Sequence, residues 1–484
     1  MKTIADLPLV SGRTWNGHAY EFRQNPMDLL VRAQKELMDN GHGDVGKLQF
    51  FHFPAVLLFS PELIHEALVE KAKHINKSLA LKIMFYPMAG RGLFTSDGDL
   101  WRRQRKLMAP LFHPAAIRSY AGTMNEIITR CLDTWQDGEI IDAGREMTRL
   151  TMGVAAKTLF DANTLDESQD ISDAIHAMFN YINGQTGSVS VVIRAMLAGT
   201  LMAKTDLSPS MAKVRDNIVE TLHEPVPVPT PERLRLFRGL RLLNERMQRI
   251  TEERRRTGVQ RDDLLSRLLA ARDEDDGSFM TDRQVRDEAM TLFVAGHETT
   301  ATSTTWALYF MSRNPEVYRR WKEEVAGLGG DEPSPDNTPK LVWTRGIFRE
   351  ALRFYPPVFA FDRITVEDME LGGYSLPAFT PLIFPNIAIH RNPLLWPNPE
   401  QFDPGRYTPE LEAKRPRGAY MPFGLGHRVC IGAMFAELEA LLLFAQIAQR
   451  FEFEPVDSAP VEPDMQAVFR PKTPVRLRVR KIAK

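Results

Sequence analysis

The ten residues Phe423–Gly432 read FGLGHRVCIG and include Cys430, one of two cysteines in the 484-residue chain. Gly424 and Gly426 free the backbone to turn tightly, which lets amide N–H groups point at a sulfur. The apolar stretch IGAMFAELEALLLFAQIA that follows predicts a helix starting at Cys430, and the partial positive charge of a helix N-terminus favours a thiolate. The stretch therefore predicts a thiolate that can ligate iron.

Two other interpretations of Cys430 are open from this stretch alone. A buried structural cysteine beside an ordinary turn is the commonest fate of a lone cysteine. A catalytic nucleophile would need an oriented base, and nothing nearby in the sequence supplies one. Motifs elsewhere in the chain have to decide among the three.

Five residues of the stretch resemble the haem-binding loop of cytochromes P450, FxxGxRxCxG, and fill every fixed position: Phe423, Gly426, Arg428, Cys430 and Gly432. The resemblance implies that Cys430 is the axial ligand of the iron in haem b, where an anionic thiolate favours cleavage of the O–O bond of dioxygen. It also implies that Phe423 shields the sulfur, that Arg428 pairs with a haem propionate, and that Gly432 lets the helix approach the porphyrin.

A second motif is the pair Glu350 and Arg353 in FREALRFYPP, which share one helical face because they are three residues apart. Alone, such a pair is usually solvated and contributes little stability. Here it resembles the ExxR pair of P450s. The resemblance implies that Arg406, in the later FDPGR, is the third member of a buried network behind the haem loop.

A third motif, AGHETT at residues 295–300, places a glycine and polar side chains inside an apolar helix. A glycine and buried polar side chains destabilise a core helix, so their presence indicates a functional site. A glycine kink with threonines hydrogen-bonded to the preceding turn explains the same residues equally well. The motif resembles the distal (A/G)GxxT of P450s. The resemblance implies that Gly296 opens a groove for dioxygen, Thr299 hydrogen-bonds the bound oxygen, and Glu298 delivers protons through water.

The stretch DLWRRQRK, residues 99–106, is by default a solvated basic helix face. It is also similar to the WxxxR pattern of P450s, which implies that Trp101 and Arg105 contact a haem propionate. Arg363, in AFDRITVED, matches the position of another propionate-binding arginine. The remaining basic residues of the stretch are expected to dock an acidic electron-transfer protein of the ferredoxin or flavodoxin type: Arg102, Arg103 and Lys106.

Apolar residues fall in segments that line the substrate pocket of P450s: Phe85, Met88, Phe293, Ala295, Val358, Phe359 and Met465. Their character predicts a hydrophobic small-molecule substrate. Core packing would account for the same residues. We assign no role at the site to His427, Cys131 or His113, and we expect the last two to be structural.

Composition excludes some classes of function. A formal net charge of −1 gives no global field that would favour nucleic acid or an anionic membrane. Two widely separated cysteines fit a reducing compartment. The N-terminus MKTIADLPLVSGRTWNGHAYEF lacks the apolar core of a signal peptide or membrane anchor, so we expect a cytoplasmic monomer without an anchor.

Hydrophobic periodicity predicts helices over most of residues 100–353, including one long core helix that begins at Asp282, and short strands elsewhere. Two of these strands, KLQFFHF and AVLLF, are expected to join across Pro54. The resemblance implies one P450 haem domain over 1–484, an α-rich triangular prism enclosing haem with a small β subdomain. The β-rich segments are expected at 43–60, 359–390 and 450–484, and the α-rich segments at 61–355 and 430–449.

The resemblance as a whole implies a monooxygenase that inserts one atom of dioxygen into a lipid, terpenoid, steroid or polyketide-like substrate, by hydroxylation or epoxidation. No reductase segment is evident, so electrons are expected from NAD(P)H through a separate protein. The alternatives are a peroxide-driven or rearranging haem-thiolate enzyme and a non-catalytic haem carrier or sensor. The intact pair Glu298 and Thr299 argues against the first alternative.

Overall fold

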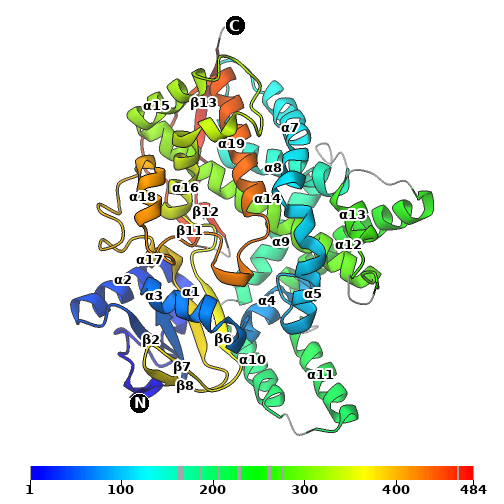
Figure 1. Ribbon diagram of the computed structural model, residues 1–484, viewed down its shortest axis with the longest axis vertical. Coiled ribbons are helices and arrows are strands. Elements are labelled where there is room, and N and C mark those ends of the chain that lie inside the picture. The colour runs from blue at the N-terminus through cyan, green and yellow to red at the C-terminus, as the bar shows by residue number, and fades with distance from the viewer. Residues whose placement is uncertain are drawn as a thin grey trace.

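The structure is a computed structural model that describes residues 2–161, 168–185, 188–204, 207–225, 230–258, 263–273, 277–465 and 468–482. Figure 1 shows a body of helices with the N-terminal sheets at its lower left. The helices are α1 (Ala19–Gln24), α2 (Pro26–Asp39), α3 (Pro61–His65), α4 (Leu79–Ala89), α5 (Gly98–Met108), α6 (Pro114–Ser119), α7 (Ala121–Asp133), α8 (Ala143–Phe160), α9 (Ser168–Gln185), α10 (Val189–Met202), α11 (Pro209–His223), α12 (Pro231–Thr257), α13 (Leu264–Ala270), α14 (Asp282–Arg313), α15 (Pro315–Ala326), α16 (Val342–Phe354), α17 (Asn386–Ile389), α18 (Pro409–Lys414) and α19 (Ala433–Arg450). The prediction of a mainly helical chain is confirmed.

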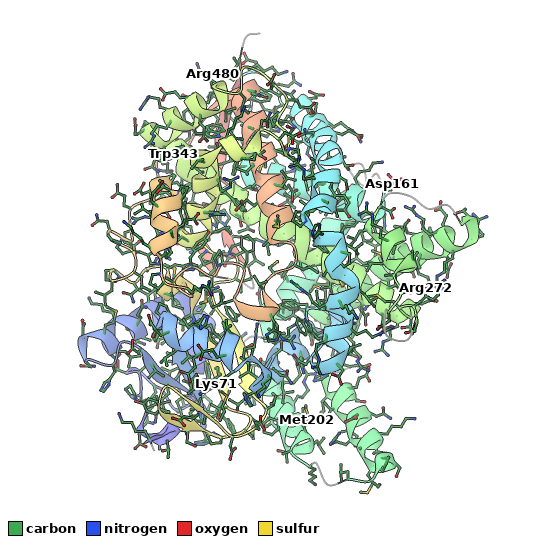
Figure 2. All side chains as sticks on the ribbon, viewed as in Figure 1. Lys71, Asp161, Met202, Arg272, Trp343 and Arg480 are labelled. Carbon is green, nitrogen blue, oxygen red and sulfur yellow. The ribbon has the colours of Figure 1, made fainter. Side chains whose placement is uncertain are left out.

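The strands are short and belong to several sheets. They are β1 (Lys2–Thr3), β2 (Val45–Phe50), β3 (Phe53–Leu58), β4 (Ile75–Asn76), β5 (Ile140–Asp142), β6 (Phe361–Thr365), β7 (Met369–Leu371), β8 (Tyr374–Leu376), β9 (Pro381–Phe384), β10 (Phe451–Pro455), β11 (Pro463–Met465), β12 (Phe469–Pro471) and β13 (Arg476–Lys481). The largest sheet has the order β2-β3-β9-β6-β4, and β10-β13-β5, β1-β8-β7 and β11-β12 form the others. The C-terminal strands therefore pair with β5 and with one another, apart from the N-terminal sheet. Figure 2 accordingly places Arg480, on β13, at the opposite end of the molecule from Lys71, which precedes β4.

The expected junction of β2 and β3 at Pro54 is wrong. The chain reverses at Phe51, whose φ is 55°, and Pro54 lies inside β3 opposite Gln49. Proline is tolerated there because β3 pairs with β9 only further along, at Val56 and Leu57, so the missing N–H interrupts no ladder on that side.

The long apolar segment forms one buried helix, α14, as predicted. A capping box between Thr281 and Gln284 starts it, and most of its residues are buried from Val285 to Met311. It packs against α8, α16 and α19, and Figure 1 shows it passing through the middle of the helical body. α14 is therefore the wall against which an internal site can form. No helix among the described residues is long and apolar enough to cross a membrane.

Candidate active site

The loop before α19 is closed by its own backbone. The amide of Cys430 donates to the carbonyl of Phe423 at 2.8 Å, and Gly424 and Gly426 have φ values of 77° and 74°. A Cβ on Gly426 would lie 2.2 Å from the carbonyl oxygen of Leu68. Neither the positive φ of Gly426 nor its short distance to Leu68 tolerates a side chain. Glycine is therefore required at this position for the cysteine loop to pack against Leu68.

The predicted start of the following helix at Cys430 is wrong. α19 begins at Ala433 with Gly432 as its N-cap, so the sulfur lies before the first turn. The protein around Cys430 raises the pKa of its thiol by desolvation although the residue itself is exposed, while the amide of Gly432 and the guanidinium of Arg105 act in the opposite direction. The helix end thus contributes through one hydrogen bond. A metal cation at the sulfur would complete the stabilisation of a thiolate.

A strip of α14 faces accessible space although the helix lies in the core. Ala295 is exposed and Gly296 and Thr299 are half-buried, whereas Val294 and Glu298 are buried. A Cβ on Gly296 would meet no atom within 4 Å. The hydroxyl of Thr299 donates to the carbonyl of Ala295 at 2.8 Å. The strip is therefore an open surface with one hydroxyl, as the distal motif requires.

The cysteine loop and this part of α14 border the same apolar cluster. Ile431, next to Cys430, packs against the cluster that contains Phe293 of α14. Met88 belongs to it and Phe85 packs against it, so three expected pocket residues come together.

The other expected pocket residues are more scattered. Phe359 packs against a different cluster, stacked on Phe469 with centroids 5.1 Å apart, and Val358 is 39% exposed. Met465 lies in β11, and its side chain is outside the described part of the structure.

Arg428 lies beside Trp101, with its guanidinium carbon 4.2 Å from the ring centroid. Its Nη2 pairs with Asp97 at 2.6 Å and its Nη1 donates to the carbonyl of Ser96 at 3.0 Å. Its Nε is buried and has no hydrogen-bond partner among the described residues. Arg105 donates to the carbonyl of Val429 at 3.1 Å. The WxxxR pattern and the cysteine loop therefore meet.

Lys77 is a buried residue of this site that the sequence analysis missed. Its Nζ donates to the carbonyl of Leu93 at 2.7 Å and forms no ion pair with a described residue. Burial, together with the positive charge of Arg428, holds the pKa of Lys77 well below its usual value. Burial likewise lowers the pKa of Arg363 to about 10, and Arg428 adds to the shift.

The positive charges in this region outnumber the carboxylates. The cations are Lys77, Lys82, Arg363 and Arg428, and their carboxylate neighbours are Asp97, Asp362 and Glu288. A buried surplus of this sign is costly unless an anion compensates it. The arrangement fits a group that brings two carboxylates next to Cys430, as the propionates of haem would.

The ExxR pair lies in a buried network of charged groups. Arg353 binds Glu350 through two hydrogen bonds of 2.8 Å, and both side chains are 0% exposed. Nε of Arg406 lies 3.2 Å from Glu350, and the hydroxyl of Tyr407, which sequence reasoning missed, donates to the same carboxylate at 3.1 Å. The structure thus brings the three predicted residues together.

The network is connected to the cysteine loop through one histidine. Arg353 donates to the carbonyl of His390 at 2.8 Å, and the Nε2 of His390 accepts from the amide of Met421 at 3.1 Å. Met421 lies just before Phe423. The ion pairs therefore fix the start of the loop that carries Cys430.

Glu298 and Arg103 form ion pairs within the chain that the sequence analysis did not predict. Glu298 is buried at the border of the open strip, where it pairs with Arg470 at 2.7 Å. Arg103 pairs with Asp273 at 2.6 Å and is only 25% exposed, whereas Arg102 is 70% exposed and pairs with Asp99. Arg103 is therefore committed to a contact within the chain.

Comparisons with known proteins agree with this geometry. The family model described as Cytochrome P450 matches residues 8–479. Cyclooctatin synthase of Streptomyces melanosporofaciens is 33% identical over 93% of this chain and 90% of its own length. Pentalenene oxygenase of Streptomyces avermitilis is 31% identical over 97% of this chain and 95% of its own length.

A solved structure, the cytochrome P450DA heme domain, superposes with a TM-score of 0.80 and 25% sequence identity over 99% of this chain and 98% of that one. The predicted fold class is thereby confirmed. The match extends over nearly the whole chain, and the residues around Cys430 fit the cofactor of that family. The chain therefore belongs to the cytochrome P450 family and is a haem-thiolate monooxygenase that uses dioxygen.

Proposed function

We propose that this enzyme hydroxylates a cyclic terpenoid. The observation that carries the proposal is the apolar cluster beside the open strip of α14, to which Phe85, Met88 and Phe293 contribute. A hydrocarbon offers no polar group for recognition, so its binding depends on apolar contact. The names of the two Streptomyces relatives, cyclooctatin synthase and pentalenene oxygenase, support terpenoids over the other hydrophobic classes.

The roles of the residues follow from their placement. When bound, haem supplies the redox chemistry that activates dioxygen. Cys430 would hold the iron, and Lys77, Arg363 and Arg428 would hold the propionates. The hydroxyl of Thr299, at the open strip, would hold a proton next to the reacting oxygen, and the carboxylate of Glu298 would bring protons to it.

The substrate class is tested by ligand-induced spin shifts. The purified ferric enzyme is titrated with cyclic terpene hydrocarbons, with a straight-chain fatty acid and with a steroid, and the Soret band is recorded. We expect the terpenes alone to shift the band at micromolar concentration. Gas chromatography with mass spectrometry then identifies the hydroxylated product. A shift with the fatty acid and none with any terpene would contradict the proposal.

The same preparation distinguishes the rival activities. A monooxygenase consumes NAD(P)H and dioxygen in proportion to product when a ferredoxin and its reductase are present. A peroxide-driven or rearranging enzyme forms product without NAD(P)H, and a carrier binds the terpene without forming any product. Either of the last two results would replace the proposed reaction.

We further propose that a separate acidic electron-transfer protein docks beside α5 and that the enzyme is a monomer. We also propose that it is cytoplasmic, because its two widely separated cysteines fit a reducing compartment. Because Arg103 is only 25% exposed, the docking charges are those of Arg102 and Lys106, which are both exposed. Replacing both with glutamate should slow reduction by an acidic ferredoxin roughly tenfold and weaken its salt dependence. Stopped-flow reduction of the haem measures this.

The control for docking is Arg235→Glu together with Arg238→Glu on α12, which makes the same change of net charge at other exposed residues. It should leave the reduction rate close to that of the unaltered enzyme. Equal slowing by the α5 and α12 substitutions would show that net charge, and not a docking site, governs the rate.

A further inference from the structure

The segment between α4 and α5 is attached to α14 by two neighbouring acidic side chains. The amide of Arg91 donates to Asp287 at 2.8 Å, and the amide of Leu93 donates to Glu288 at 2.9 Å. A Cβ on Gly90 would lie 2.3 Å from the carboxylate oxygens of Asp287, so the backbone passes directly beside this side chain. The segment therefore contacts α14 through its backbone.

Leu93 is held through both of its backbone polar groups. Its amide donates to Oε2 of Glu288, and its carbonyl accepts from Nζ of Lys77 at 2.7 Å. Both partner side chains are buried, with exposed fractions of 0% for Glu288 and 8% for Lys77. Burying two ionisable side chains to hold one backbone residue costs stability, because each side chain loses its hydration. Such a cost indicates that the position of Leu93 matters for function.

Leu93 and Phe94 form part of the apolar cluster beside the open strip of α14. Leu93 is a member of the cluster that contains Phe293, and Phe94 packs against it. The ring of Phe94 makes an edge contact with the ring of Phe85, with the ring centroids 4.9 Å apart. Because Phe94 follows Leu93 in the chain, the position of the Leu93 backbone fixes where Phe94 meets Phe85.

Glu288 lies on the face of α14 that carries the open strip. It precedes Ala295 by seven residues and Thr299 by eleven, which are close to whole turns of an α-helix. The three residues therefore share one face. Ala295 is exposed on this face, whereas Glu288 is buried and bonded to Leu93. The segment that Glu288 holds thus covers the end of the strip nearer the start of α14.

We propose that Glu288 is a positioning residue that limits the size of the substrate, because by holding the amide of Leu93 it keeps Phe94 against Phe85 at this end of the pocket. The role needs a hydrogen-bond acceptor and not a charge. Burial raises the pKa of Glu288 to about 8, so the carboxyl is mostly protonated at neutral pH, and its carbonyl oxygen still accepts from an amide. Glutamine should therefore replace Glu288, and leucine should not.

The inference rests on the proposed function, since it takes the wall at Phe85 as a contact of the substrate. The first test needs no substrate and measures how firmly the segment is held. Hydrogen–deuterium exchange with mass spectrometry is followed in the ferric holoenzyme for peptides that cover residues 90–96. Glu288→Leu should raise exchange there about tenfold, as expected for the loss of one hydrogen bond, and Glu288→Gln should exchange like the unaltered enzyme. Unchanged exchange in Glu288→Leu, or equal acceleration in both variants, would overturn the proposal.

The second test uses probe ligands that coordinate the haem iron, so it does not depend on the natural substrate. The ferric enzymes are titrated with 4-phenylimidazole and with a bulky triphenylmethyl imidazole, and each Kd is obtained from the Soret band. Glu288→Leu should improve the affinity for the bulky probe relative to the compact one by about tenfold, the lower end of what one misplaced apolar group changes in a pocket. Glu288→Gln should restore the original ratio. The same ratio in all three enzymes, or an equal change in both variants, would overturn the proposal.

The matched control is Thr304→Val, further along α14. The hydroxyl of Thr304 is buried and donates to the carbonyl of Thr300 at 2.8 Å, so this change also removes one buried hydrogen bond from the helix. It should leave the exchange of residues 90–96 and the ratio of affinities unchanged. Changes equal to those of Glu288→Leu would assign the effects to a disturbed α14. If Glu288→Leu does not accumulate as holoenzyme, Glu288→Met against Glu288→Gln in the same assays decides the question.

Terpene titrations of the same enzymes separate this inference from the proposed function. If no cyclic terpene shifts the Soret band of the unaltered enzyme while the probe ratio changes as expected, the terpenoid proposal is wrong and the role of Glu288 is supported. If the terpenes bind to the unaltered enzyme and to Glu288→Leu with equal Kd, the role of Glu288 is wrong and the proposed function is supported.

Discussion

At the scale of single residues, Cys430 depends on backbone geometry more than on a helix end. The loop closes through the hydrogen bond of its amide to Phe423, and Gly426 allows the approach to Leu68. Gly432 adds the single amide that contacts the sulfur. Cys430 is exposed in front of this loop, and a metal cation bound to the sulfur would stabilise its thiolate.

The first prediction concerns this sulfur. Cys430→Ala should abolish the red-shifted Soret band of the reduced CO complex, because no other thiolate can replace the axial ligand. Cys131→Ala is the matched control, since Cys131 is 2% exposed in the core and should leave the band in place. Absorption spectra of the two variants decide the point. A band that survives in Cys430→Ala would contradict the assignment.

At the scale of elements, α14 both carries the open strip and positions the chain between α4 and α5. Its Asp287 accepts from the amide of Arg91 at 2.8 Å, and its Glu288 accepts from the amide of Leu93 at 2.9 Å. A Cβ on Gly90 would lie 2.3 Å from the carboxylate of Asp287. Hydrophobic periodicity could predict this helix but not these bonds, because their partners are distant in the sequence.

The second prediction concerns Glu288, whose burial raises its pKa to about 8. Between pH 5 and 8 the folded state keeps a proton that the unfolded state has lost, so this group makes the free energy of unfolding fall as pH rises, by up to about 1.4 kcal/mol per unit. Glu288→Gln cannot ionise, so its unfolding free energy should fall less steeply over this range. Denaturant titrations at several pH values measure the slope.

The control for this slope is Glu316→Gln at the exposed start of α15, where Arg319 lowers the pKa of the carboxyl. That carboxylate is already ionised in both states above pH 5, so the slope should not change. A Glu288→Gln variant with the slope of the unaltered protein would show that Glu288 does not titrate in this range.

At the scale of the whole molecule, the site is assembled from segments that are far apart in the sequence. The four motifs could be predicted because each needs fixed residue types at short spacing, as in Glu350 and Arg353 or Phe423–Gly432. Lys77, Tyr407 and Arg470 could not, since each gains its role only when packing brings another segment to it. A lysine before a helix is ordinarily solvated, and the residues next to Lys77 in the sequence do not predict that it is buried.

The last prediction concerns the positive charge of Lys77. This charge should help to retain haem in the holoenzyme and should lower the stability of the haem-free protein. If Lys77 binds a propionate in the holoenzyme as proposed, Lys77→Met removes a charge-assisted hydrogen bond worth about 1.5–3 kcal/mol, so haem transfer to apomyoglobin should be roughly tenfold faster. In the haem-free protein the same change relieves repulsion from Arg428 and Arg363, so the Tm should rise by about 1 °C per kcal/mol relieved.

Lys322 provides the matched control for this opposite behaviour. Its ammonium donates to the carbonyl of Phe451 at 3.1 Å, and burial lowers its pKa, but it lies on α15 outside the propionate site. Lys322→Met should change the Tm of the two forms in the same direction and leave haem transfer unchanged. Only a residue that pairs with the cofactor can stabilise the holoenzyme and destabilise the haem-free protein. A Lys77→Met variant with a lower Tm in both forms would therefore contradict the proposed pairing and show that Lys77 serves packing before α4.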